Sequence, residues 1–148
     1  MSRPTFRRPT EILLVEDNSA DALLVREALK ESERSAHLSV VEDGDRALAF
    51  LRRQAPYSNA PRPDFILLNL RMPHKDGLEV LAEIKNDLRL RAIPVLIFTS
   101  SVSPADIQQC YALQANAYIV KPFELSRFIA IVQEIELFWG RVVTLYSE

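Results

Sequence analysis

Four short apolar runs of the chain end in polar residues that could bind a metal ion or a phosphoryl group. The residues are Glu16 with Asp17, Asn69, Thr99 and Lys121. Adjacent carboxylates are hard oxygen ligands that suit Mg²⁺, which usually takes one or two of them and keeps several waters. A lysine ammonium and a threonine hydroxyl can stabilise a phosphoryl group carried by a neighbouring oxygen nucleophile. The pattern therefore predicts the parts of a phosphoryl site from which the nucleophile itself is missing.

The elements that must position these residues are short strands alternating with helices. Strands are predicted at 11–15, 38–41, 65–68, 95–98 and 118–120. Helices are predicted after Asn18, over 45–54, over 76–87, after Ser103 and from about Glu124. Such alternation indicates an α/β fold with a parallel sheet, right-handed crossovers and helices on both faces. Because the carboxyl ends of parallel strands share one edge, the polar residues should meet there, where open α/β sheets bind ligands.

Composition and length exclude several classes of protein. The 148 residues suit one domain, which we expect over 11–148 after an N-terminal leader over 1–10. A net charge of −2 and a pI of about 5.8 argue against binding to nucleic acid or to an anionic membrane. Three glycines are too few for a P-loop or a dinucleotide-binding fingerprint. No apolar run is long enough for a membrane span or a signal peptide, so we expect a cytoplasmic protein.

Several segments together carry a family resemblance. They are residues 14–18, 64–73, 76–77, 98–100 and 118–123. Over essentially its whole length the chain resembles the receiver domains of bacterial two-component response regulators. The resemblance implies a flavodoxin-like (β/α)5 fold whose five-stranded parallel sheet has the order 2-1-3-4-5. It also implies signal transduction by phosphorelay, with a sensor histidine kinase as the partner.

The resemblance assigns a role to each polar residue at the expected site. Glu16 and Asp17 would bind Mg²⁺, with the backbone carbonyl of Arg71 as a third protein ligand. Thr99 and Lys121 would contact the phosphoryl group.

Two further features are implied by the same resemblance. Tyr118 would change its side-chain conformation together with Thr99 when the domain is activated. The bond between Lys121 and Pro122 would be a cis peptide bond.

The chain departs from the family at the phosphoacceptor, where Asn69 replaces an aspartate. A carboxamide has no anionic oxygen and cannot form a stable acyl phosphate. The replacement also removes a charge that would repel a carboxylate ~5 Å away by about 3 kcal/mol at an effective dielectric of about 20. We therefore expect Mg²⁺ binding to be weakened or absent. Asn69 could be natural, engineered, or an amide that deamidates slowly before the bulky Leu70.

The C-terminal part of the chain predicts a homodimer. The loop over 57–63 and the long C-terminus resemble the single-domain regulators that partner bacterial phytochromes. Apolar residues crowd the end of the chain beyond the compact fold, namely Phe138, Trp139, Val142, Val143 and Leu145. Apolar surface at an exposed terminus usually finds a partner, and a second copy of the chain is the simplest one.

Three hypotheses for the function follow. The first is a non-enzymatic receiver that signals through protein contacts with Asn69 unphosphorylated. The second is a phosphorylatable receiver whose Asn69 is an engineered or deamidated aspartate, and the third is a non-signalling dimeric adaptor. Direct DNA binding is not expected, because five arginines are interpreted as scattered on solvated faces: Arg52, Arg53, Arg62, Arg89 and Arg91.

Overall fold

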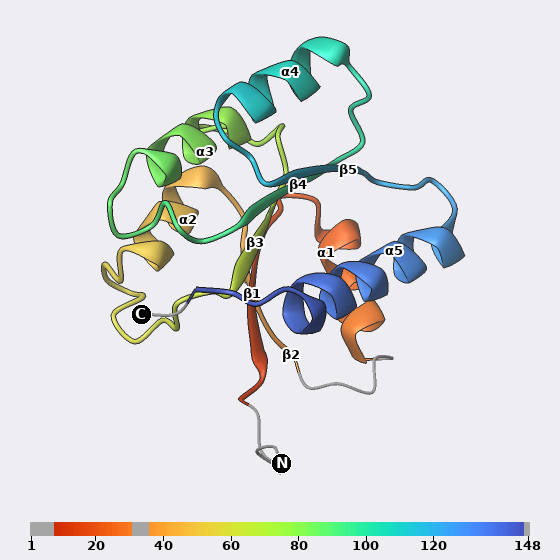
Figure 1. The fold of residues 1–148 in the computed structure, drawn as a ribbon, viewed down its shortest axis with the longest axis horizontal. Coiled ribbons are helices and arrows are strands. Elements are labelled where there is room, and N and C mark those ends of the chain that lie inside the picture. Colours follow the sequence, from red (N-terminus) through yellow and green to blue (C-terminus); the bar gives the residue numbers. More distant parts are fainter. Residues whose placement is uncertain (1–7, 31–35, 147–148) are drawn as a thin grey trace.

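The sheet has the predicted topology. The structure, a computed structural model, describes residues 8–30 and 36–146. Five strands form one parallel sheet in the order β2-β1-β3-β4-β5 (Figure 1). They are β1 (Thr10–Val15), β2 (Ala36–Val41), β3 (Phe65–Leu68), β4 (Val95–Thr99) and β5 (Ala117–Val120). The predicted α/β class and strand order are therefore confirmed.

Helices cover both faces of the sheet. They are α1 (Ser19–Lys30), α2 (Gly44–Leu51), α3 (Gly77–Lys85), α4 (Pro104–Ala112), α5 (Leu125–Leu137) and a π-helical turn η1 (Phe138–Val142). Helices α1 and α5 lie on one face, and α2, α3 and α4 lie on the other (Figure 1). Within the described ranges, no helix is both long enough and apolar enough to cross a membrane.

The central strands are buried on both faces, which explains their continuous apolar sequences. Their side chains alternate between two cores. One core, under α1 and α5, includes Phe98 and Phe128, whose ring centroids are 5.3 Å apart. The other core, under α2, α3 and α4, includes Leu68 and Cys110. Burial raises the pKa of the Cys110 thiol to about 11, so this cysteine is a small apolar core residue.

Helices α1, α3 and α4 begin at side-chain caps close to their predicted starts. Asn18 Oδ1 accepts a hydrogen bond from the Asp21 amide at 3.0 Å. Asp76 and Glu79 form a capping box, and Ser103 Oγ accepts from the amide of Asp106 at 3.3 Å. These side chains satisfy amide groups that the first turn of a helix leaves unpaired.

The ends of two helices and one peptide bond differ from the predictions. Helix α2 ends three residues early, because Arg53 adopts a left-handed backbone with φ of 54°. Helix α3 ends at Lys85 and not near Asp87. The Lys121–Pro122 bond is trans, so the expected cis bond was wrong, and trans is the more stable isomer for most X–Pro bonds.

The polypeptide is fixed at the amino end of β1. The Arg8 guanidinium donates to both carboxylate oxygens of Asp64 at 2.7 and 2.6 Å. Asp64 also accepts from the Glu11 amide at 2.8 Å. The part of the expected leader over residues 1–7 lies outside the described residues.

Candidate functional site

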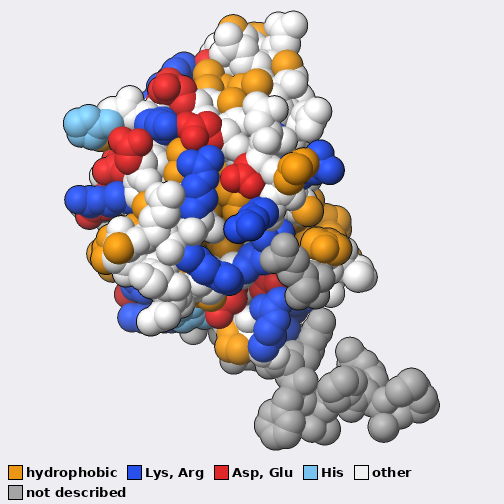
Figure 2. All heavy atoms as spheres, turned by 90° about the vertical axis from the view of Figure 1, so that its left-hand side faces the viewer, with side chains coloured by type: hydrophobic (Ala, Val, Ile, Leu, Met, Phe, Trp, Pro, Cys, Tyr) orange, Lys and Arg blue, Asp and Glu red, His pale blue; other side chains and the backbone are white. Residues whose placement is uncertain are grey.

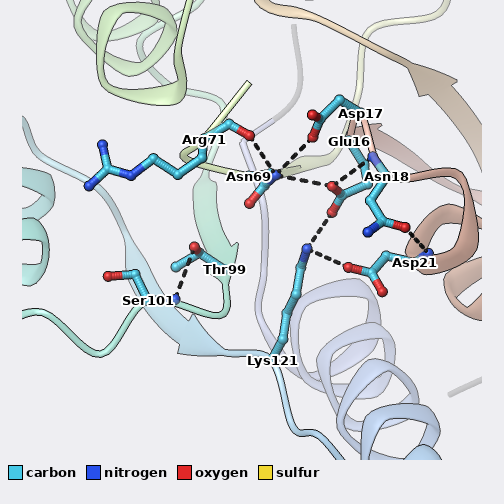
Figure 3. Close-up of polar contacts among 9 residues, drawn as sticks. All are labelled: Glu16, Asp17, Asn18, Asp21, Asn69, Arg71, Thr99, Ser101 and Lys121. Carbon is cyan, nitrogen blue, oxygen red and sulfur yellow. Dashed lines mark hydrogen bonds and ion pairs between the residues drawn. The ribbon is translucent and has the colours of Figure 1, made fainter. Parts of the chain in front are cut away.

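The carboxyl ends of four strands bring the polar residues of the sequence analysis into one cluster (Figure 3). Glu16 and Asp17 follow β1, Asn69 follows β3, Thr99 ends β4 and Lys121 follows β5. Each residue lies at or directly after the end of its strand, and β1, β3 and β4 are almost entirely buried, whereas β5 is partly exposed. The juxtaposition expected from the parallel topology is therefore present.

The side-chain amide of Asn69 lies at the centre of the cluster. Its Nδ2 donates to Glu16 Oε2 at 3.0 Å, to Asp17 Oδ1 at 3.2 Å and to the backbone carbonyl of Arg71 at 3.2 Å. Asn69 is only 8% exposed. These three acceptors are the three oxygens expected to hold Mg²⁺. The amide nitrogen thus stands at the point on which all of the expected metal ligands converge (Figure 3).

Lys121 lies between two carboxylates. Its Nζ contacts Glu16 Oε1 at 2.7 Å and Asp21 Oδ2 at 2.8 Å. Burial of Glu16 raises the pKa of its carboxyl group, although Lys121 acts in the opposite direction. Burial alone would lower the pKa of Lys121, but the hydrogen bonds to Asp21 and Glu16 outweigh burial and raise it. Lys121 therefore stays charged and is held away from solvent.

Thr99 and Tyr118 both contact the backbone of Ser101, which lies two residues after the end of β4. Thr99 Oγ1 accepts from the backbone amide of Ser101 at 3.3 Å. The Tyr118 hydroxyl donates to the backbone carbonyl of Ser101 at 2.9 Å. The two residues expected to move together are thus linked through one peptide segment.

Arg71 joins the cluster to the start of α4. Its backbone carbonyl accepts from Asn69, and its guanidinium donates to both oxygens of Asp106 at 2.8 Å. Ser101 Oγ donates to the same carboxylate at 2.6 Å. The Ser101 hydroxyl, followed by Arg71, holds the pKa of Asp106 below its usual range despite burial. Asp106 is therefore an ionised, buried link between two loops of the site.

The sequence analysis missed two members of this network. Asp21 was not singled out, although it lies one helical turn after Asp17 in the first turn of α1, a position from which its side chain can face the cluster. Asp106, in the first turn of α4, was not assigned to the site either. A carboxylate in the first turn after each of these strands was the available signal.

The residues expected at a dimer interface do not form one open face. Phe138 is 51% exposed and Val142 is 63% exposed. Trp139 packs partly against the core under α1 and α5, with its ring centroid 5.9 Å from that of Phe138. Val143 and Leu145 are partly buried.

The donor set at the cluster is chemically suited to Mg²⁺. Two carboxylates and one backbone carbonyl are hard oxygen ligands, and Mg²⁺ binds such oxygens at about 2.0–2.1 Å. Among the described residues there is no group of three or more His, Cys, Asp and Glu side chains that could hold a metal. An ion would therefore depend on Glu16, Asp17 and Arg71, whose oxygens now accept from Asn69.

Comparison with known proteins identifies the family. The response regulator receiver domain family matches residues 12–133. Response regulator Rcp1 of Synechocystis sp. is 47% identical over 137 residues, which cover 93% of this chain and 93% of Rcp1. The crystal structure of the phosphorylated cyanobacterial phytochrome response regulator RcpA has a TM-score of 0.91 and 47% identity, covering 95% of this chain and 100% of RcpA. The Mn²⁺-bound form of Rcp1 has a TM-score of 0.89 and 47% identity, covering 94% of this chain and 100% of Rcp1. This chain therefore belongs to the receiver domains of two-component response regulators.

Proposed function

We propose that this chain signals by contacting other proteins and does not carry a phosphoryl group on Asn69. The observation that carries the proposal is that the two N–H groups of the Asn69 amide are shared among three acceptors, the oxygens of Glu16, Asp17 and Arg71. A phosphoacceptor must attack with an anionic oxygen, which a carboxamide lacks. The chain accordingly has no enzymatic activity of its own.

The proposal includes a weakened metal site. Receiver domains bind Mg²⁺. In this chain an ion could approach its three oxygen ligands only after the Asn69 amide had given up its hydrogen bonds to them. It would also lack the attraction of a third carboxylate at position 69. Whether the asparagine is natural or engineered, the geometry disfavours the ion in the same way.

The proposed partner is a sensor histidine kinase, and a bacterial phytochrome is the favoured type. RcpA is described as a phytochrome response regulator, and it shares 47% of its sequence with this chain. A groove of about 270 Å³ beside Lys121 is lined by Phe123, which is fully exposed, and by Leu125, which is 56% exposed. Exposed apolar side chains next to a charged site are typical of a surface that contacts another protein.

The active form is proposed to be a homodimer in the cytoplasm. The exposed Phe138 and Val142 at the end of the chain supply the apolar surface for a second copy. The one cysteine, Cys110, is buried and unpaired, which suits a reducing compartment.

A second candidate is a phosphorylatable receiver in which position 69 carries, or acquires, an aspartate. The observation that favours it is the retention of every other expected part: the two carboxylates, the Arg71 carbonyl, Thr99 and Lys121 meet at one edge (Figure 3). A site without any phosphoryl chemistry would not need this set.

Phosphotransfer separates the candidates. A phytochrome-type histidine kinase carrying a radioactive phosphoryl group is mixed with the wild type, Asn69→Asp and Asn69→Ala, and binding to the kinase is measured in parallel. We expect all three to bind the kinase and only Asn69→Asp to acquire the label.

Any other outcome would favour a different candidate function or a different phosphoacceptor. Label on the wild type but not on Asn69→Ala would support the phosphorylatable receiver. Label that survives Asn69→Ala would reveal a different acceptor. A wild type that does not bind the kinase would leave only the dimeric adaptor.

A further inference from the structure

Four arginines from three separate segments of the sequence line a single groove on the α2 and α3 side of the molecule. Arg52 and Arg53 follow α2, Arg62 precedes β3 and Arg89 follows α3. The expectation that these arginines are scattered was therefore wrong for four of the five, and the fifth, Arg91, does not line the groove. The groove has a volume of about 1030 Å³. Figure 2 shows basic side chains gathered around a hollow on this face.

The side chains of Arg53 and Arg62 are held in place by the fold. Arg53 Nε donates to the Ala60 carbonyl at 2.9 Å, and Arg62 Nη1 donates to the Arg89 carbonyl at 2.8 Å. The contact of Arg53 orients its guanidinium through one of the five N–H donors. For these two side chains, part of the entropy cost of ordering is thus met before any ligand binds.

The groove has a net positive charge, although acidic residues also line it. Arg52 lies 3.4 Å from Glu83 and 3.5 Å from Asp87, so two of the lining residues are acidic. Four arginines and these two acids leave a net charge of +2 among the lining residues. The planar guanidinium forks of Arg53 and Arg89 match carboxylate or phosphate oxygens in pairs.

The apolar part of the groove favours a polypeptide over a nucleic acid. Leu51 and Leu90 are buried beneath it, whereas Leu88 at its edge is 78% exposed. Among the described residues that line the groove there is no aromatic side chain on which a base could stack. The acids Glu83 and Asp87 would also repel a continuous phosphate backbone.

We propose that this groove, which we call the arginine groove, binds an acidic segment of a partner protein. Carboxylates of the segment pair with Arg53 and Arg89, and an apolar side chain of the segment packs on Leu88. The arginine groove lies on the face opposite α1 and α5 and contains none of the residues around Asn69. The inference therefore goes beyond the proposed function and stands apart from it.

An NMR titration of the full chain tests the arginine groove. The probes are a soluble peptide of glutamate and leucine residues and a single-stranded oligonucleotide of equal charge. We expect the peptide to shift backbone amide signals of residues 51–54, 62 and 86–90. Replacing both arginines, as Arg53→Asn with Arg89→Ala, should weaken peptide binding about tenfold or more. Asparagine is chosen at position 53 because it tolerates the left-handed backbone there.

A matched control removes two charges elsewhere. Arg26→Ala with Arg127→Ala changes exposed residues of α1 and α5 and should leave peptide affinity unchanged. The arginine groove would be rejected if the peptide at millimolar concentration shifts none of these amides. Equal affinities for the groove variant and the control, or tighter binding of the oligonucleotide, would reject it as well.

Discussion

The carboxyl edge of the sheet and the C-terminal segment, which spans residues 138–145, differ in how many of their side chains find partners within the chain. At the edge, Glu16 and Asn69 are buried and each contacts polar partners from other parts of the chain. No buried side-chain nitrogen or oxygen in the described residues lacks a hydrogen-bond partner. In the C-terminal segment, by contrast, Phe138 and Val142 expose more than half of their surface.

The two regions therefore differ in what a ligand or a partner protein could add to them. In the proposal above, the Asn69 amide already occupies the position between the oxygens, so the cluster would gain little from an ion or a phosphoryl group. A segment that exposes large apolar side chains gains free energy when a partner covers them, at about 25 cal/mol per Å². In the proposal above, the first region needs no ligand, whereas the second is the surface on which a partner would bind.

The largest effect is expected at the C-terminal segment. Phe138→Glu with Val142→Glu should weaken dimerisation by about 4 kcal/mol, since two buried anchors at the centre of an interface are each worth about 2 kcal/mol. The free energy of unfolding of the monomer should change little, because both side chains are exposed. Light scattering over a dilution series measures the mass. Val102→Glu, at a residue that is 69% exposed elsewhere, is the control, and an unchanged dimer in the double variant would refute the placement.

An effect of similar size, on the free energy of unfolding, is expected at Lys121. Lys121→Met leaves the Glu16 carboxylate, whose side chain is 1% exposed, without its nearest cation. Removing one partner of a buried ion pair costs about 3–5 kcal/mol, and urea unfolding measures the loss. Adding Glu16→Gln should restore much of it, since no buried charge then remains. A loss below about 1 kcal/mol would show that the cluster is more hydrated than its burial indicates.

The third prediction concerns a carboxylate placed at position 69. In metal-free buffer Asn69→Asp should lower the free energy of unfolding by about 2–3 kcal/mol, because a third carboxylate replaces an amide that donates to two others. Millimolar Mg²⁺ should close this gap by binding the variant more tightly than the wild type. Unfolding with EDTA and with Mg²⁺ compares the two. Asn59→Asp, the same change at an exposed loop residue, should show neither effect, and equal Mg²⁺ stabilisation of wild type and Asn69→Asp would contradict the account.

Most of the fold and the gathering of the site could be read from residue types along the chain. Apolar runs ending at Glu16, Asn69 and Lys121 predict buried strands and a shared polar edge, because parallel strands leave no other arrangement. The caps at Asp76 and Ser103 were predictable since they act on amides only three residues away.

The contacts that decide the function could not be read in the same way. The turn of the Asn69 amide toward three oxygens depends on the positions of loops from separate strands. The arginine groove depends on how the ends of α2 and α3 pack, which brings Arg53 and Arg89 together across the fold. No local pattern encodes such long-range placement, and the π-helical turn η1 likewise has no signal in the sequence.

The smallest effect is expected at an ion pair outside both regions, and it tests whether burial determines how strongly such a pair stabilises the fold. Asp64 is 11% exposed, but its partner Arg8 is 61% exposed. Burial alone would raise the pKa of Asp64, but Arg8 and the Glu11 amide outweigh it and lower the pKa. A carboxyl group whose pKa is lowered by folding stabilises the protein above its unfolded pKa of about 3.9, and this contribution is lost as the pH falls through the folded value.

Asp64→Asn should therefore cost about 1 kcal/mol at neutral pH, and the difference from the wild type should shrink as the pH falls below about 4. Urea unfolding at neutral and at acid pH measures both values, with Asp45→Asn at an exposed position of α2 as the control. A cost as large as that of Lys121→Met would show that a half-exposed ion pair stabilises this fold as strongly as a buried one. The stabilisation by the Lys121–Glu16 ion pair at the carboxyl edge would then depend on something other than its burial.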